Sequence, residues 1–117
     1  CINIMGEAAF GMVGMDFETA VRNQIGTTTI VMKNSVMGGY ADNHPVAAQQ
    51  YAIHELGGNY ADIAKALGGY GERITKPEQI IAALHRALEM NNNGTPALIE
   101  IITAEETKKA TTLPNDF

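Results

Sequence analysis

Three features that would point to a particular class of protein are scarce or missing in this sequence: cysteines, clustered basic residues and long apolar runs. Cys1 is the single cysteine, so no disulfide forms within the chain, which suits a reducing cytoplasm. The 8 basic residues are outnumbered by 13 acidic ones, and they form no cluster of the kind that binds nucleic acid. No apolar run reaches the length of a membrane span, and no secretory signal pattern is visible. We therefore expect a cytoplasmic protein without nucleic-acid or membrane partners.

The 117 residues, 45% of them hydrophobic, suffice for one domain with a core of its own. The first residues already read as a buried strand, and we expect Cys1 to be an inert thiol within it. A strand with no lead-in indicates a fold that is incomplete at the N-terminus. We interpret the chain as a piece of a larger protein; a shortened expression product is the alternative.

Strand-like and helical segments alternate along the chain. Short apolar or β-branched runs predict strands at residues 1–5, 27–32, 72–74 and 97–102. After a break at residues 6–9, helical spacing predicts a helix from Phe10 to a cap at Gly26. A second helix is predicted over residues 60–67. A third is predicted to begin at a Thr75-x-x-Glu78 capping box and to end at residue 90. This order predicts an α/β fold with a parallel sheet and helices on both faces.

Residues 33–59 form a long polar stretch with room for short helical turns, and a loop of that length is usually functional. His54 lies in this stretch and is expected to face solvent. The three histidines of the chain show no metal-ligand spacing.

Two predicted strands end in polar residues. Glu7 follows the first strand and Asn34 follows the second, and ligands of parallel sheets bind at the carboxyl ends of the strands. A carboxylate with an amide oxygen suits Mg²⁺, and small residues at Ala8 and Ala9 let backbone N–H groups approach a phosphate. The residues alone leave two alternatives open: Glu7 complements a helix dipole, and Asn34 forms a turn.

The segment GEAAFGMVGMDFETAVRNQIGTTTIVMKNSVMGGY resembles the cofactor motif of thiamine diphosphate enzymes, closest to the acetolactate synthase, benzoylformate decarboxylase and pyruvate decarboxylase group. Their pattern is Gly-Asp-Gly or Gly-Asp-Ala, a spacer of under thirty residues, and Asn-Asn. The segment YADIAKALGGYGERITKPEQIIAALHRAL, followed by GTPALIEI, resembles the end of their C-terminal domain. The resemblance implies a Rossmann-like thiamine diphosphate-binding domain over residues 1–103, followed by a polar tail over residues 104–117.

Carried over by position, the resemblance implies roles for eight residues. Glu7 and Asn34 stand at the metal-ligand positions, and Val36 stands where a backbone carbonyl completes the protein's share of the Mg²⁺ shell. The remaining five are implied to face the cofactor: Ala8, Ala9, Met12, Met37 and Gly38. All of these except Met12 are implied to do so through backbone groups near the diphosphate. Met12 is equally well explained as a core methionine. No residue of the chain is implied to be catalytic.

Two residues depart from the family pattern. Glu7 replaces aspartate, which extends the carboxylate by about 1.5 Å, and octahedral Mg²⁺ tolerates such a displacement poorly. Lys33 replaces the first asparagine, where its charge would repel a metal ion or pair with Glu7 or with a phosphate. An ion pair between Lys33 and Glu7 is expected if the site has lost its cofactor.

The resemblance implies a thiamine diphosphate-dependent lyase or transferase that acts on small 2-oxo acids by carboligation or decarboxylation, with thiamine diphosphate and Mg²⁺ as cofactors. The activating glutamate of such enzymes belongs to another domain, so the remaining part of the enzyme is an expected partner, as is a second subunit of a homo-oligomer. Whether FAD is bound is left open, because no FAD-binding domain lies in this chain. The alternative is a degenerate, non-catalytic piece with a structural or regulatory role.

Overall fold

A computed structural model describes residues 1–105, which fold around a four-stranded parallel sheet. The strands are β1 (Ile2–Gly6), β2 (Thr28–Lys33), β3 (Tyr70–Ile74) and β4 (Ala97–Ile102), in the spatial order β1-β2-β4-β3. All three pairings are parallel, with Met5 opposite Val31 and Val31 opposite Glu100. The predicted α/β class is confirmed, and the carboxyl ends of all four strands lie at one edge.

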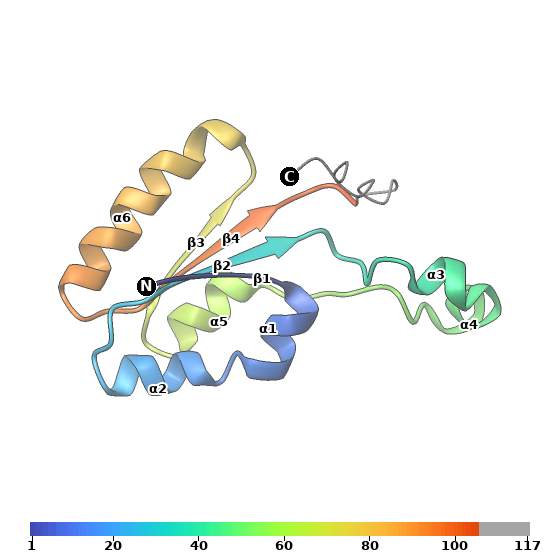
Figure 1. Cartoon of the computed structure of the whole chain (residues 1–117), viewed down its shortest axis with the longest axis horizontal. Helices are drawn as coiled ribbons and strands as arrows, with labels where there is room; N and C mark the ends of the chain where they lie inside the picture. The colour runs from blue at the N-terminus through green and yellow to red at the C-terminus, as the bar shows by residue number, and fades with distance from the viewer. Residues whose placement is uncertain (106–117) are drawn as a thin grey trace, which may run out of the picture.

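Helices cover both faces of the sheet, as predicted. Helices α1 (Glu7–Val13), α2 (Asp16–Arg22) and α5 (Tyr60–Ala66) lie on one face. Helix α6 (Ile80–Asn92), preceded by the 3-10 turn η1 (Pro77–Gln79), lies on the other (Figure 1). Each strand is therefore connected to the next along the chain by helices that cross one face, which is why the strands run parallel.

Each face has its own hydrophobic core. On the α1, α2 and α5 side, the buried cluster consists of Phe10, Phe17, Val31, Tyr60, Ala64 and Leu98. On the α6 side, it consists of Ile30, Ile74, Ala83, Ala87, Ala97 and Ile99. Successive residues of β2 and β4 alternate between the two clusters, because side chains of a strand point to opposite faces in turn.

The first helical segment differs from the prediction. We expected a break at residues 6–9 and one helix from Phe10, but α1 begins at Glu7 and ends at Val13, and α2 starts at Asp16. Gly6 has an extended conformation and serves as the N-cap, so the strand passes directly into the helix. The helix is interrupted at Gly14, where the ring and carbonyl of Phe10 come so close that a Cβ would meet them at 2.6 Å.

Two further boundaries were predicted incorrectly. The short strand expected at residues 72–74 begins earlier, at Tyr70. The expected Thr75–Glu78 capping box does not form, because the side chain of Gln79 accepts the N–H groups of Thr75 and Lys76 instead, at 3.2 and 3.1 Å. Glu78 follows Pro77 in the η1 turn, so the residue that reaches back is one position later than predicted.

The long stretch after β2 contains two short helices, as anticipated. Helices α3 (Tyr40–Asn43) and α4 (Pro45–Tyr51) project beyond the carboxyl end of β2 and away from the sheet (Figure 1). Gly39 precedes α3 with φ of 79°, a left-handed conformation that glycine adopts without strain. The predicted tail, residues 104–117, lies outside the described residues apart from positions 104 and 105.

β1 is an edge strand, and one of its faces is open. Ile2 is 64% exposed and Ile4 is 66% exposed, because α6 covers β2, β3 and β4 but not β1. Cys1 precedes β1 and is exposed, so the expectation of a strand-buried thiol was wrong. Within residues 1–105, no helix is both long and apolar enough to cross a membrane.

Candidate functional site at the carboxyl edge of the sheet

Glu7 is a buried carboxylate at the carboxyl edge of the sheet. It is the first residue of α1 and only 3% exposed. Its Oε1 accepts the backbone N–H of Ser35 at 2.6 Å, and its Oε2 accepts the backbone N–H of Asn34 at 3.1 Å. The carboxylate thus joins the end of β1 to the loop after β2. The structure brings together the two residues that the sequence placed at neighbouring strand ends.

Asn34 and Val36 lie in the loop that contacts Glu7. Asn34 Oδ1 accepts the backbone N–H of Val36 at 3.0 Å, which fixes the amide in a tight turn. Val36 pairs with Glu55 in an isolated antiparallel bridge, flanked by bonds from Leu56 N–H to the Ser35 carbonyl and from Met37 N–H to the His54 carbonyl. In residues 1–105, no hydrogen bond ends on the Val36 carbonyl. That oxygen is therefore available to a further ligand.

Lys33 does not pair with Glu7. Its Nζ donates to Ser35 Oγ at 3.0 Å, and within residues 1–105 it forms no ion pair with a carboxylate. Ser35 thus contacts both charged groups, through its backbone N–H to Glu7 and through its hydroxyl to Lys33. Its φ of 63° is unusual for a residue with a side chain and creates this geometry. From the sequence, Ser35 was only one of the polar residues after the second strand and had no role of its own, since no spacing signals a positive φ there.

Tyr60, at the start of α5, packs next to this edge. Its ring meets Phe10 of α1 edge-on, with centroids 5.5 Å apart, and its hydroxyl donates to the Gly57 carbonyl at 2.9 Å. Burial raises the pKa of Tyr60, and the nearby carboxylates of Glu7 and Glu100 raise it further. Tyr60 therefore lies near both carboxylates and links α5 to the helix that carries Glu7.

Glu100 is a second buried carboxylate, in the middle of β4 and fully inaccessible. It accepts the Ala61 N–H near the start of α5 at 3.0 Å and two donors of Arg73, Nε at 3.2 Å and Nη2 at 3.3 Å. These bonds hold α5 against β3 and β4. Because Tyr60 is the first residue of α5, they also hold Tyr60 in place. A glutamate inside the apolar run ALIEII was the sequence signal for this residue, and it was overlooked.

The remaining predicted residues lie around this edge, with different exposures. Ala8, Ala9 and Met37 are half-buried, whereas Gly38 is exposed. Met12 is 78% exposed on α1, so the alternative that it is a core methionine was wrong. His54, expected to face solvent, is half-buried instead, and its Nδ1 is enclosed without a hydrogen-bond partner in the described structure.

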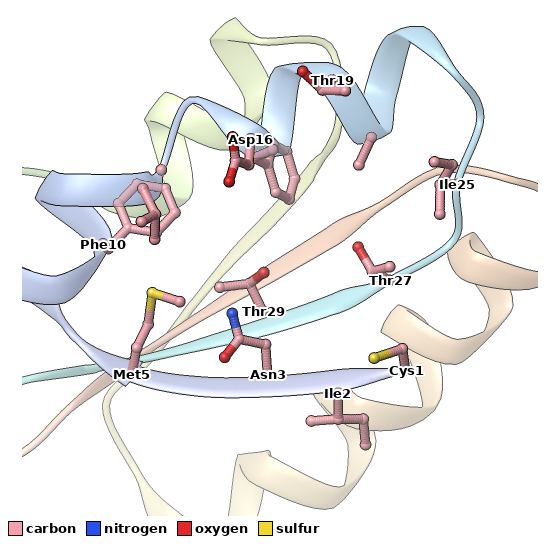
Figure 2. Close-up of a pocket in the computed structure, with 14 residues that line it drawn as sticks. Cys1, Ile2, Asn3, Met5, Phe10, Asp16, Thr19, Ile25, Thr27 and Thr29 are labelled. Carbon is pink, nitrogen blue, oxygen red and sulfur yellow. The ribbon is translucent and has the colours of Figure 1, made fainter.

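A separate groove of about 610 Å³ lies between β1 and helices α1 and α2. Figure 2 shows Asn3 and Met5 rising from β1 toward Phe10 and Asp16 on the helices. Neither Glu7 nor Asn34 lines it, and Asp16 is its only charged side chain within the described residues. The groove therefore does not contain the polar group at the strand ends.

The oxygen atoms at the carboxyl edge suit a hard divalent cation. Within residues 1–105 no three histidine, cysteine, aspartate or glutamate side chains cluster in the manner of a transition-metal site. Carboxylate, amide and backbone carbonyl oxygens are instead the donors that Mg²⁺ takes, usually few in number and supplemented by phosphate and water. Each oxygen of Glu7, and Oδ1 of Asn34, accepts one hydrogen bond and retains a second lone pair.

Comparison with known proteins identifies the family of the chain. Residues 1–101 match the family described as thiamine pyrophosphate enzyme, C-terminal TPP binding domain. The chain is 32% identical over 104 residues to an acetolactate synthase large subunit of Mycobacterium tuberculosis, covering 86% of this chain and 18% of that protein. It is 33% identical over 104 residues to a sulfoacetaldehyde acetyltransferase of Alcaligenes xylosoxydans xylosoxydans, covering 86% and 17%.

The fold is also that of a solved thiamine diphosphate-dependent 4-hydroxybenzoylformate decarboxylase from Rhodococcus jostii RHA1, with a TM-score of 0.75 and 18% identity. That match covers 92% of this chain and 20% of the decarboxylase. The chain therefore belongs to the thiamine pyrophosphate enzyme family, as its C-terminal, cofactor-binding domain. It spans about a fifth or less of the length of the relatives it matches, and these carry different reaction names.

Proposed function

We propose that residues 1–103 hold the Mg²⁺-diphosphate end of thiamine diphosphate in a larger enzyme that acts on 2-oxo acids by acetolactate synthase-like carboligation or by decarboxylation. The observation that carries this proposal is the buried Glu7 carboxylate, which two backbone N–H groups hold beside Asn34. A carboxylate that is 3% exposed and has no cationic partner within residues 1–105 leaves room for a divalent ion as its counter-charge.

In this proposal Glu7, Asn34 and the Val36 carbonyl bind Mg²⁺. Backbone groups of Ala8, Ala9, Met37 and Gly38 face the diphosphate, and Met12 lies close to the cofactor. Glu7 is the first residue of α1, and its carboxylate extends back to the loop after β2, where it accepts the Ser35 N–H. Bound thiamine diphosphate supplies an electron sink for bond cleavage next to a carbonyl. The residues of this chain would fix its anionic end.

The activating glutamate and the rest of the cofactor site would come from the remaining part of the enzyme or from a second subunit. A degenerate, non-catalytic role was the alternative, and it predicted an ion pair between Lys33 and Glu7. That ion pair is not formed, since Lys33 donates to Ser35. Lys33 thus makes no direct ion pair with the Glu7 carboxylate, which supports a cofactor-binding site over a lost one.

Substitution of Glu7 in the intact protein tests the proposal. Glu7→Gln removes the charge while keeping the size, so thiamine diphosphate affinity at limiting Mg²⁺ should fall tenfold or more, which is about 1.4 kcal/mol or greater. Glu7→Asp restores the ligand of relatives and should keep or tighten binding. Glu18→Gln is the matched control, because Glu18 lies exposed in α2 and pairs only with Arg22 among residues 1–105.

Calorimetric titration measures the affinity of each variant, and circular dichroism shows whether it remains folded. Unchanged affinity in Glu7→Gln would contradict the metal-binding role of Glu7. Absence of thiamine diphosphate binding in the wild-type intact protein would contradict the proposed function itself.

A further inference from the structure

Lys33 lies at the same edge of the sheet as Glu7. Met5 and Val31 lie opposite one another in the sheet, and both contribute to the core on the α1, α2 and α5 side. Lys33 follows Val31 by two residues in β2, so it lies on the same face, at the carboxyl end. Glu7 follows Met5 by two residues. The two charged residues therefore stand at equivalent ends of neighbouring strands.

The ammonium group of Lys33 has donors to spare. It is half-buried, and Ser35 Oγ at 3.0 Å is its only hydrogen-bond partner among residues 1–105. A lysine ammonium carries three N–H donors, so two remain for another acceptor. The same Ser35 that accepts from Lys33 donates to Glu7 at 2.6 Å, so one residue holds the cation and the anion a short distance apart without a direct ion pair.

On the basis of the proposed function, we propose that Lys33 is a direct ligand of the diphosphate and reduces the dependence of thiamine diphosphate binding on Mg²⁺. Without a metal ion, Glu7 alone would present one negative charge to an anionic ligand. The positive charge of Lys33 cancels it, so the metal-free site is neutral. With Mg²⁺ bound, the full double charge of the metal acts on the diphosphate, because Lys33 again offsets Glu7. Lysine is a common phosphate ligand and acts as a point charge.

The test compares thiamine diphosphate binding with and without divalent cation in the intact protein. Calorimetry would measure the dissociation constant at saturating Mg²⁺ and again in excess EDTA. Lys33→Asn carries the uncharged asparagine of the family pattern, and Lys33→Arg keeps the charge. Lys65→Asn is the control for an equal change in net charge, because Lys65 lies exposed on α5 and pairs with Asp62.

We expect the wild-type protein and Lys33→Arg to retain measurable affinity in EDTA, and Lys33→Asn to lose at least tenfold there. At saturating Mg²⁺ the loss should be smaller, and Lys65→Asn should match wild type under both conditions. Inorganic pyrophosphate should show the same ranking in EDTA, since the contact is with phosphate oxygens.

Equal affinities of wild type and Lys33→Asn in EDTA, with normal binding of both in Mg²⁺, would overturn the role of Lys33 and leave the proposed function intact. Binding of thiamine diphosphate by the wild-type protein in Mg²⁺ but not in EDTA would likewise overturn the role of Lys33 and leave the proposed function intact. If no form binds thiamine diphosphate even with Mg²⁺, both the proposed function and this inference fail. A melting curve of Lys33→Arg, which is expected to fold normally, separates loss of contact from loss of structure.

Discussion

Replacing Arg73 with methionine would leave the buried carboxylate of Glu100 without its cation. Glu100 is fully inaccessible, and its remaining partner within residues 1–105 would be the Ala61 N–H at 3.0 Å. Removal of one partner from a buried ion pair typically destabilises a protein by about 3 to 5 kcal/mol. The side chain of Arg73 is 41% exposed, so solvent reaches one side of the pair, and we expect the lower end, about 3 kcal/mol.

Urea unfolding of the chain, followed by far-ultraviolet circular dichroism, measures this loss. With a slope of about 2 kcal/mol/M, a loss of about 3 kcal/mol moves the midpoint by about 1.5 M. The double variant Arg73→Met/Glu100→Gln should recover part of the stability, because a neutral amide oxygen still accepts the Ala61 N–H and no buried charge is left unpaired. A loss below about 1 kcal/mol in Arg73→Met, or equal losses in the single and double variants, would refute the reasoning.

Two other predictions concern β3. Hydrogen bonds from Arg86 lower the pKa of Glu72 below its ordinary value of 4.5, and a hydrogen bond from Tyr70 lowers it further. Partial burial of Glu72 opposes this shift but does not cancel it. The unfolded chain therefore binds more protons than the folded chain below about pH 4.5, so this stabilisation is present above that pH and is lost as the pH falls further. We expect Glu72→Gln to lower the urea midpoint at pH 7. The midpoint of the variant should also be less sensitive to acid below about pH 4.5, and parallel acid profiles for variant and wild type would contradict this. Gly71→Ala would place a Cβ 1.9 Å from the Ala61 carbonyl oxygen and should cost about 2 to 3 kcal/mol in the same assay. In the control Gly57→Ala, the new Cβ meets nothing within 4 Å, so stability should change by under about 0.5 kcal/mol. Similar losses in the two variants would show that the contact with Ala61 does not cause the destabilisation of Gly71→Ala.

The strands of the sheet were predictable because they are short apolar runs whose flanking residues in the sequence differ in character from the runs themselves. The runs TTTIVM and ALIEII became β2 and β4 with boundaries shifted by at most one residue. Helix boundaries were less accurate where backbone geometry decided them. At the interruption, the Gly14 backbone lies so close to Phe10 that a side chain there would clash, and the cap at Gln79 depends on which side chain reaches the N–H groups before Pro77. Neither contact has a periodic signal in the sequence.

The same distinction applies to the candidate site. That Glu7 and Asn34 would approach one another followed from parallel strands whose carboxyl ends share an edge. Their bonding did not follow, because the Glu7 carboxylate contacts backbone N–H groups whose orientation depends on the positive φ of Ser35. For Lys33, the sequence left repulsion, an ion pair and phosphate binding open. The structure rules out the ion pair by placing the ammonium on Ser35.

The open side of β1 has a practical consequence for handling this chain. Within residues 1–105, its outer backbone groups pair with no strand, and Ile2 and Ile4 present an apolar surface beside them. An unpaired parallel edge next to exposed isoleucines is a template for adding strands from other molecules. We therefore expect concentrated samples of the 117-residue chain to self-associate through β1. A charged substitution at Ile4, which is already solvent-exposed, would suppress such growth without touching either core.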